Sequence, residues 1–323
     1  MRVRGSALFA VLALAAGCVN GGAEVVEPVP TLFDDRVSTT VVPDEATTTA
    51  TEPTTTVPVR DRLPGLADDV VGAVLGEGGV VLPITGTDGE VWFLRGPCGE
   101  ERIEPVSTAT LVGPHHVVLD PGGLDDEAGA VNLAVALRTA ELLTAQGVAV
   151  TLTRTSMAQM SAATRGAVGP AVGALVTVSI ERGVGDAVTA DPRPTVFHRA
   201  DDVDSRRLAG LIHHELVDAF ASLEGTFTAQ REPGVRSLLN QRGDDYFLVL
   251  GTDPAAAAAR VELLGLGADE TALLGSEEGR DVEAGALAAA VVRYLVSSEE
   301  GDGFIDPVEV VRTAPTSNTP GGC

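Results

Sequence analysis

The chain has 323 residues and a mass of 33.0 kDa, which allows one large domain or two small ones. Hydrophobic residues make up 44% of it and charged residues 21%, a balance that excludes a wholly disordered chain. The 46 acidic residues outnumber the 22 basic ones, all of which are arginine, and the net charge is −24. Nucleic-acid binding and attraction to anionic lipid both require a basic surface, so neither is expected.

The N-terminal segment has the pattern of a secretion signal. Two arginines precede Ala7–Ala16, an uninterrupted apolar run that is too short to span a bilayer. The run leads into Gly17 and Cys18, which complete a sequence that resembles a bacterial lipobox, in which the cysteine is lipidated. We therefore expect residues 1–17 to be a signal peptide and the protein to be extracytoplasmic. A lipid on Cys18 would anchor it to the outer face of the bacterial cell membrane, and ordinary secretion is the alternative.

The next two segments differ in composition. Residues 18–62 are rich in threonine, proline and acidic residues and poor in the large apolar side chains of a core, which is typical of a linker. Residues 63–110 contain short apolar runs, such as Val80–Ile84 and Val91–Leu94, separated by glycine-rich turns. This spacing predicts a small β-hairpin unit.

Residues 111–298 alternate between short apolar strands and amphipathic helices. The expected strands are Val117–Asp120, Val148–Leu152, Ala174–Ile180 and Val261–Leu264, and the expected helices are Val131–Leu143, Met157–Val168, Val203–Phe220 and Val282–Val296. This order predicts an α/β domain with a mainly parallel sheet covered by helices on both faces. Functional sites in such sheets lie at the carboxyl ends of the strands. Residues 299–323 are expected to form a flexible tail.

The three cysteines of the sequence are Cys18, Cys98 and Cys323. If Cys18 carries lipid, an even number of thiols remains in an oxidising compartment, where disulfides form and persist. We therefore expect Cys98 and Cys323 to form a disulfide, and two free thiols are the alternative.

Six segments of the α/β domain occur in a characteristic order between about Val117 and Leu295. They are Val118–Gly122, Asn132–Leu137, Gly147–Arg154, Val178–Ile180, Leu238–Gly243 and Val261–Leu263. In this order they resemble the zinc-dependent N-acetylmuramoyl-L-alanine amidases, which cleave bacterial cell wall. The resemblance implies the amidase fold and, as the partner of the protein, peptidoglycan or a muropeptide.

The chemistry of that family requires a zinc ion held by His, Glu and His, with an acidic residue as general base. By correspondence, the first histidine would follow Gly122 and is absent. The glutamate position is Ala128, and the second histidine position is Glu181. Only the general base has a match, Glu262. The resemblance therefore implies a degenerate site without a metal cofactor, in which Glu262 is vestigial.

Other residues offer substitutes for the lost ligands. Glu127 is one position from the lost glutamate, and His198 lies near the end of a candidate strand. An all-oxygen site would favour Ca²⁺ or Mg²⁺ over zinc. The acidic residues available to build it are Asp125, Asp126, Glu127, Glu181 and Glu262. A solvated acidic turn over residues 125–127 is the simpler interpretation.

Three functions remain open on these grounds. The first is a degenerate, amidase-like lipoprotein that binds peptidoglycan without cleaving it. The second is an active amidase with a rebuilt metal site, and the third is a scaffold for another envelope protein. Arg154 and Arg242 lie in family-like segments, where each either pairs with a carboxylate of a peptide stem or forms a structural ion pair.

Overall fold

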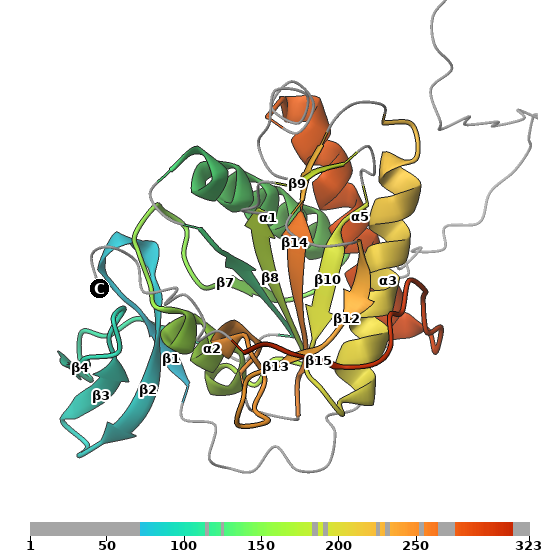
Figure 1. Cartoon of the computed structure of the whole chain (residues 1–323). Helices are drawn as coiled ribbons and strands as arrows, with labels where there is room; N and C mark the ends of the chain where they lie inside the picture. Colours follow the sequence, from blue (N-terminus) through green and yellow to red (C-terminus); the bar gives the residue numbers. More distant parts are fainter. Residues whose placement is uncertain are drawn as a thin grey trace, which may run out of the picture. The chain divides into compact units, whose positions relative to one another are not determined.

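The computed structural model describes residues 72–113, 116–123, 126–182, 187–189, 193–223, 227–229, 233–251, 255–263 and 275–312. The expected signal peptide, the linker and Cys323 lie outside these residues. The described part is an α/β structure with one large sheet and one small one (Figure 1). Among its helices, none is long and apolar enough to cross a membrane.

The main sheet has six strands in the order β12-β10-β14-β8-β6-β7. The strands are β6 (Val117–Pro121), β7 (Val150–Leu152), β8 (Val176–Arg182), β10 (Thr195–His198), β12 (Gly234–Arg236) and β14 (Ala257–Leu263). β7, β6, β8 and β14 are parallel, whereas β10 is antiparallel to β14 and parallel to β12. The prediction of a mainly parallel sheet is confirmed, and the strands at one side of it run in the opposite direction.

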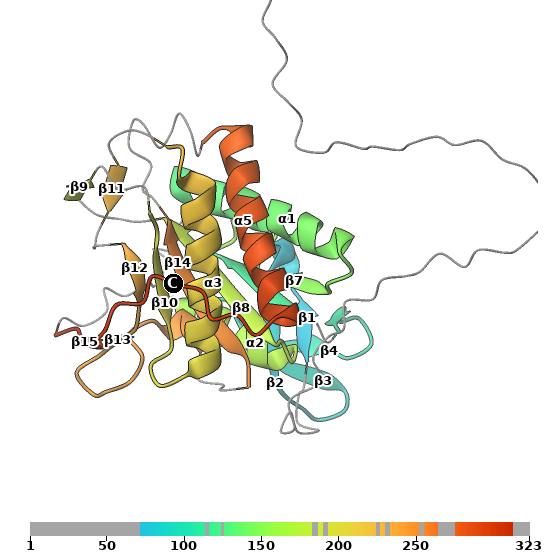
Figure 2. The same cartoon turned by 90° about the vertical axis from the view of Figure 1, so that its right-hand side faces the viewer.

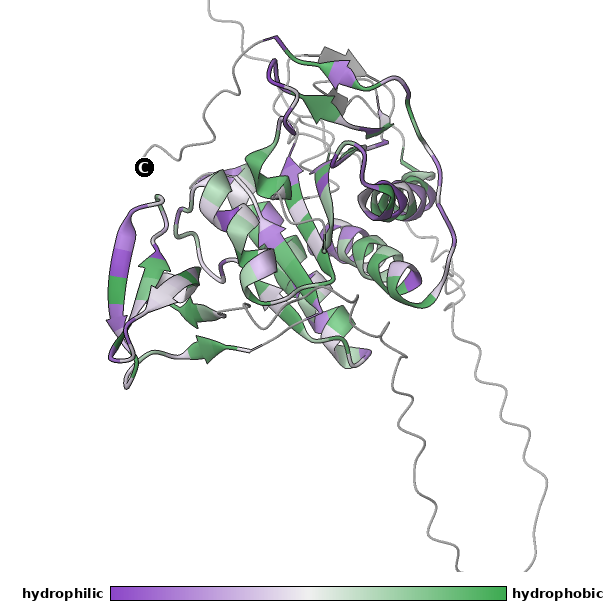
Figure 3. Ribbon diagram, turned by 90° about the horizontal axis from the view of Figure 1, so that it is seen from below, coloured by the Kyte–Doolittle hydropathy of each residue, from purple (hydrophilic) through white to green (hydrophobic). Residues whose placement is uncertain are grey.

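Three long helices cover one face of this sheet: α1 (Glu127–Ala145), α3 (Val203–Phe220) and α5 (Glu277–Val296) (Figure 2). The side chains of a strand alternate between the two faces, and Val176, Val178 and Ile180 of β8 all belong to the apolar core beneath these helices. Each helix begins after a capping side chain that accepts a backbone N–H, respectively Asp126, Asp202 and Ser276. Figure 3 shows the strands of the main sheet largely in the hydrophobic colour.

The opposite face carries a shorter helix, α2 (Ala162–Ala171), and the 3-10 turn η2 (Leu248–Leu250). The two elements pack closely because α2 has a glycine at the contact, and a Cβ on Gly166 would clash with the carbonyl oxygen of Leu248. Helices therefore cover both faces, as predicted. The helix begins at Ala162, later than expected, because Ser161 caps it through the backbone N–H of Thr164.

The small sheet has five antiparallel strands in the order β4-β3-β2-β1-β5. They are β1 (Ala73–Leu75), β2 (Val81–Thr87), β3 (Val91–Arg95), β4 (Glu101–Pro105) and β5 (Leu111–Val112), with the turn η1 (Glu77–Gly79) after β1. The backbone N–H of Val81 donates to the carbonyl of Thr153, just beyond β7, and joins this sheet to the main one. The predicted hairpin unit is thus a larger antiparallel sheet that shares a core with α2.

Two further pairs of short strands complete the described structure. β9 (Ala187–Thr189) pairs with β11 (Phe227–Ala229), and β13 (Leu238–Leu239) pairs with β15 (Glu309–Val310). The second pair is parallel and brings the segment after α5 back to the main domain.

That segment also lies along the outer edge of the main sheet at β12. The carbonyl of Gly303 accepts a hydrogen bond from Val235 N–H at 2.8 Å, and Ile305 N–H donates to the carbonyl of Val235 at 2.8 Å. Gly303 has a φ of 81°, and a Cβ at this position would clash with the ring of His213 on α3. Residues 301–305 therefore pack against α3 and β12, and Glu309–Val310 pairs with β13, which corrects the expectation of a flexible tail for this part of it. Residues 313–323 lie outside the described residues.

Candidate functional site at the carboxyl ends of the strands

The register of the parallel strands brings two of the predicted site residues together. Glu181 on β8 lies directly opposite Glu262 on β14. Their neighbours along the strands, Ile180 and Val261, point into the core beneath α1, α3 and α5. Because side chains alternate along a strand, Glu181 and Glu262 lie on the opposite face, which carries α2. Glu181 is 8% exposed and Glu262 is 6% exposed. Buried carboxylates require partners, and the partners define this site.

Arg165 of α2 is the partner of Glu181. One terminal nitrogen of its guanidinium lies 2.6 Å from Oδ2 of Asp120, at the end of β6, and 3.4 Å from Oε1 of Glu181. The other terminal nitrogen donates to the same Glu181 oxygen at 3.3 Å. Burial works against the charged form of Arg165, but the charges of Asp120 and Glu181 outweigh it, so the pKa of the guanidinium is raised. One arginine therefore links the ends of two strands to the helix above them.

Asp120 is fully buried and accepts hydrogen bonds at both of its oxygens. Its Oδ1 accepts from the hydroxyl of Thr153 at 2.7 Å, and its Oδ2 accepts from the hydroxyl of Ser179 at 2.8 Å. Together with Arg165, these bonds connect β6, β8, α2 and the segment after β7. Asp120 is thus the centre of a satisfied polar network at the strand ends.

Glu262 is held by a second arginine. Arg260 lies two residues earlier on β14, on the same face, and its Nη1 donates to Oε2 of Glu262 at 2.7 Å. The guanidinium lies 4.2 Å from the ring centroid of Phe247 and 5.5 Å from that of Phe197. The residue predicted as general base is thus one partner of a buried ion pair.

The place where the resemblance expects the first histidine is closed by the backbone. Gly122 N–H donates to the carbonyl of Ile180 at 2.8 Å, and a Cβ on Gly122 would clash with the carboxyl group of Glu181. Arg154 donates to the carbonyls of Pro121 and Gly122, both at 2.9 Å, and burial lowers the pKa of its guanidinium. Arg154 therefore has the structural role, because it fixes the chain at the end of β6.

The acidic turn before α1 is also accounted for by local structure. Oδ1 of Asp126 accepts the backbone N–H of Gly129 at 2.7 Å and caps the helix. Glu127 is exposed in the first turn, where a negative charge is favourable, and Ala128 follows it. Asp125 lies outside the described residues. The solvated-turn interpretation fits what is described.

His198 does not lie with these carboxylates. Because β10 is antiparallel to β14, its first residue, Thr195, lies opposite Glu262, and His198 lies opposite Ala259 at the other end of the pairing. The Nδ1 atom of His198 contacts the carbonyl of Arg199 at 2.8 Å, and burial lowers the pKa of the imidazole. On this geometry His198 does not share a site with Glu181 or Glu262. Arg242, the other candidate arginine, is exposed and pairs with Asp244 at 3.3 Å.

The described residues do not fit a zinc ion. Zinc in proteins takes nitrogen, sulfur and carboxylate donors in tetrahedral geometry, and its catalytic sites have three protein ligands. In the described part of the chain, no three His, Cys, Asp or Glu side chains come close enough to share a metal ion. At the strand ends, Glu181 and Glu262 each accept hydrogen bonds from an arginine instead. An all-oxygen site for Ca²⁺ or Mg²⁺ would require these arginines to move.

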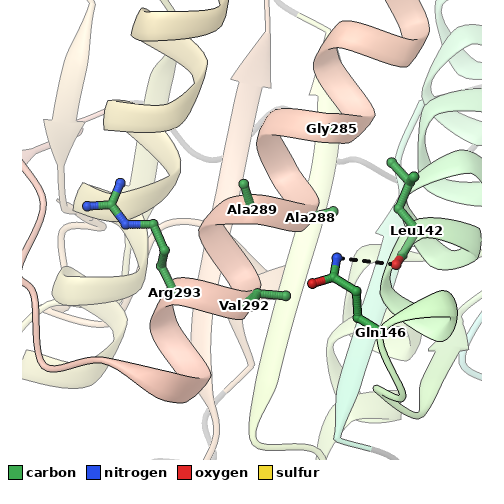
Figure 4. A pocket seen from close by; sticks show the side chains of 7 residues that line it. All are labelled: Leu142, Gln146, Gly285, Ala288, Ala289, Val292 and Arg293. Atoms are coloured by element: carbon green, nitrogen blue, oxygen red, sulfur yellow. Dashed lines mark hydrogen bonds between the residues drawn. The ribbon is translucent and has the colours of Figure 1, made fainter. Parts of the chain in front are cut away.

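A cavity of about 370 Å³ lies elsewhere, in a groove between α1 and α5 (Figure 4). It is lined by Leu142, Gln146, Gly285, Ala288, Ala289, Val292 and Arg293. The amide of Gln146 donates to the carbonyl of Leu142 at its rim. The groove belongs to the helical layer on the far face of the sheet from α2, so it is separate from the carboxylate network.

Two residues of the network, Arg165 and Arg260, were not anticipated from the sequence. A usable signal was present for each. Arg165 is the single charged residue in the ten residues of α2, and a lone charge in a short apolar helix indicates a buried partner. Arg260 and Glu262 alternate with apolar residues on one strand, which places both on one face.

No protein-family model and no curated protein matches the sequence. Several solved structures of N-acetylmuramoyl-L-alanine amidases are similar to this chain. One, from Clostridium difficile 630, has 22% sequence identity and a TM-score of 0.47, with 58% of this chain and 100% of that chain covered. The catalytic domain of the amidase CwlV from Bacillus (Paenibacillus) polymyxa var. colistinus has 23% identity and a TM-score of 0.44, with 56% and 98% covered. An amidase of Nostoc punctiforme has 23% identity and a TM-score of 0.45, with 57% and 98% covered.

Proposed function

We propose that this chain is an extracytoplasmic lipoprotein whose amidase-like domain binds peptidoglycan or a muropeptide without cleaving it. The order of the six family-like segments supports the ligand class. The observation that carries the loss of activity is the pairing of two acidic side chains with arginines: Glu181, at the second histidine position, with Arg165, and Glu262, at the general-base position, with Arg260. The protein would act by binding.

The chemical reason for the expected loss of activity lies in the hydrogen bonds that Glu262 and Glu181 already accept. Hydrolysis of an amide requires an activated water and a base that is available to accept its proton. Here one oxygen of Glu262, Oε2, already accepts a hydrogen bond from Arg260. Glu181 stands where a neutral histidine would donate a nitrogen lone pair, and its Oε1 accepts from Arg165. Both glutamates therefore contribute to the fold of the strand ends.

The anchoring of the protein is proposed on the sequence alone. Lipidation at Cys18 predicts a mature N-terminus at that residue, which mass spectrometry of the native protein measures directly. An intact Met1, or cleavage at another bond, would contradict it.

Cys98 is disulfide-bonded in the structure, and its partner lies outside the described residues. The other cysteines of the chain are Cys18 and Cys323. A lipidated Cys18 leaves Cys323 as the partner, so peptide mapping of the unreduced protein tests the two proposals together. A Cys98–Cys18 link would contradict both.

The function is tested on the mature chain with Cys18→Ser, purified from an extracytoplasmic compartment without lipid. We expect sedimentation with insoluble peptidoglycan, zinc well below one ion per chain by elemental analysis, and no release of peptides from muropeptides. About one zinc per chain, with cleavage that stops in Glu262→Ala, would overturn the proposal in favour of an active amidase with a rebuilt site. If the protein neither sediments with peptidoglycan nor cleaves muropeptides, the proposal is overturned in favour of an envelope scaffold.

A further inference from the structure

Two buried carboxylates share one guanidinium at the ends of β6 and β8. A single nitrogen of Arg165 lies 2.6 Å from Oδ2 of Asp120 and 3.4 Å from Oε1 of Glu181. The side chains of Asp120, Arg165 and Glu181 are 0%, 7% and 11% exposed. The guanidinium is therefore the positive charge that lies between the two carboxylates. A Ca²⁺ ion in its place, with ligands at about 2.3–2.6 Å, would require Glu181 to move closer.

A positive charge is needed between Asp120 and Glu181, because two negative charges that are buried together repel each other and have lost their water. Arg154 lies close by but donates to backbone carbonyls, those of Pro121 and Gly122 among them. Arg165 is thus the group that contacts both carboxylates, and nothing in the contacts of Arg154 replaces it.

The described side-chain atoms that could bind a metal ion in place of Arg165 are oxygens. The hydroxyl of Ser179 lies 2.8 Å from Oδ2 of Asp120, and the carboxyl group of Glu181 occupies the space that a Cβ on Gly122 would need. Carboxylate and hydroxyl oxygens suit the hard cations Ca²⁺ and Mg²⁺, whereas zinc prefers nitrogen and sulfur. The site without its guanidinium would be a partly formed site for such a cation.

We propose that Arg165 is the resident cation of this site, and that its guanidinium takes the structural place of a metal ion by holding the ends of β6 and β8 to α2. Two consequences follow. The native protein is indifferent to divalent cations and to chelators, because the cation position is filled by the chain itself. A chain without the Arg165 side chain loses stability and recovers part of it when Ca²⁺ or Mg²⁺ binds Asp120 and Glu181. Neither consequence depends on whether the protein binds peptidoglycan.

The experiment compares thermal unfolding of the mature chain and of Arg165→Ala, each in EDTA and in millimolar CaCl₂ or MgCl₂. We expect the midpoint of the native chain to be unchanged by the cations. In EDTA, the midpoint of Arg165→Ala should be lower than that of the native chain. Adding Ca²⁺ or Mg²⁺ should raise it by at least about 2 °C, and further as the cation concentration increases. Isothermal titration calorimetry should give about one cation per chain for this variant.

Arg182→Ala is the matched control, because it also removes a buried guanidinium but leaves one carboxylate, that of Glu283, in place of two. We expect it to lose stability without recovering any in Ca²⁺ or Mg²⁺. The double variant Arg165→Ala/Glu181→Ala removes one proposed ligand and should lose the cation response. If Arg165→Ala is insoluble, the same comparison is made on its refolding yield with and without cation. No response in Arg165→Ala, or an equal response in Arg182→Ala, would overturn the proposal.

Discussion

Two consecutive residues of β8, Glu181 and Arg182, lie on opposite faces of the main sheet, and each belongs to a buried ion pair. Arg182 meets Glu283 of α5 in a two-pronged contact, with both nitrogen–oxygen distances at 2.7 Å and side chains 1% and 0% exposed. Glu181 shares Arg165 with Asp120. The first pair has one charge of each sign, whereas the second has two carboxylates for one guanidinium.

The two regions differ in their place and in their balance of charge. The Arg182–Glu283 pair links β8 to α5 with one charge of each sign. The Arg165 network lies at the carboxyl ends of the strands, where parallel sheets carry their sites, and it includes the hydroxyls of Thr153 and Ser179.

The largest effect is expected from breaking the Arg182–Glu283 pair. Glu283→Ala leaves the guanidinium of Arg182 buried without its carboxylate, and its Nε already has no partner among the described residues. We expect a loss of about 3–5 kcal/mol in the free energy of unfolding, because an unpaired buried charge cannot reach water. Urea denaturation at fixed pH measures it.

The control for Glu283→Ala removes both charges. Arg182→Met/Glu283→Leu keeps the volume apolar, and it should recover most of the lost stability. A double variant that is as unstable as Glu283→Ala would show that packing, rather than the unpaired charge, accounts for the loss.

A smaller effect is expected in the shared network. Asp120→Asn keeps the size of the side chain and removes its charge, while Arg165 retains Glu181 as a partner. We expect a loss of about 1.5–3 kcal/mol, the usual worth of hydrogen bonds to a charged group, measured by the same denaturation. Thr153→Val, which removes one hydroxyl donor to Asp120, is the matched control and should cost about 1 kcal/mol. A loss in Asp120→Asn as large as in Glu283→Ala would mean that the two regions do not differ.

Much of this comparison rests on features that the sequence predicted. The helix over Val203–Phe220 has the expected bounds, because a clear apolar period follows a capping aspartate. The placement of Glu181 beside Glu262 follows once both are taken as ends of adjacent parallel strands. Local pattern and strand order were sufficient for both.

The rest depends on contacts between distant residues. Arg165 and Asp120 are 45 positions apart, and no local pattern states which carboxylate a lone arginine reaches. The position of His198 relative to the carboxylates depends on the direction of β10, which is set by pairing with β14 and not by the strand's own residues. The segment around Gly301 and Gly303 was interpreted as loose, whereas its glycines permit close approach to α3.

The smallest effect is expected from a third charged cluster, at the surface, where Asp302 bridges two histidines of α3. Its oxygens accept from Nδ1 of His213 at 2.9 Å and from Nδ1 of His214 at 2.8 Å, and Asp218 lies 3.6 Å from the other nitrogen of His214. The hydrogen bond to Asp302 raises the pKa of His214. Burial opposes the charged form of Asp302, but the bonds from His214 and His213 prevail, and the pKa of Asp302 is lowered. Unlike the two buried sites, this cluster includes partly exposed side chains, those of His214 and Asp302.

The sign of the pH dependence follows from these directions. A raised pKa in His214 contributes stability that is fully present below about pH 6.5 and is lost as the pH rises through the folded value. A lowered pKa in Asp302 contributes stability above about pH 3.9 that is lost as the pH falls through its folded value. The cluster should therefore stabilise the fold most between about pH 4 and about pH 6.5. Because its side chains are partly exposed, we expect a contribution below about 1 kcal/mol.

Asp302→Asn removes the shared acceptor charge while keeping its size, and the free energy of unfolding is compared with that of the native chain at about pH 5 and about pH 8. We expect the variant to be less stable at the lower pH and closer to the native chain at the higher one, because the contribution of His214 is lost as the pH rises through its raised pKa. Asp218→Asn, which removes the more distant carboxylate from His214, should show the same trend at smaller size. An equal loss at both pH values would mean that Asp302 acts through uncharged hydrogen bonds, and the segment after α5 would then be held to α3 by packing at its glycines.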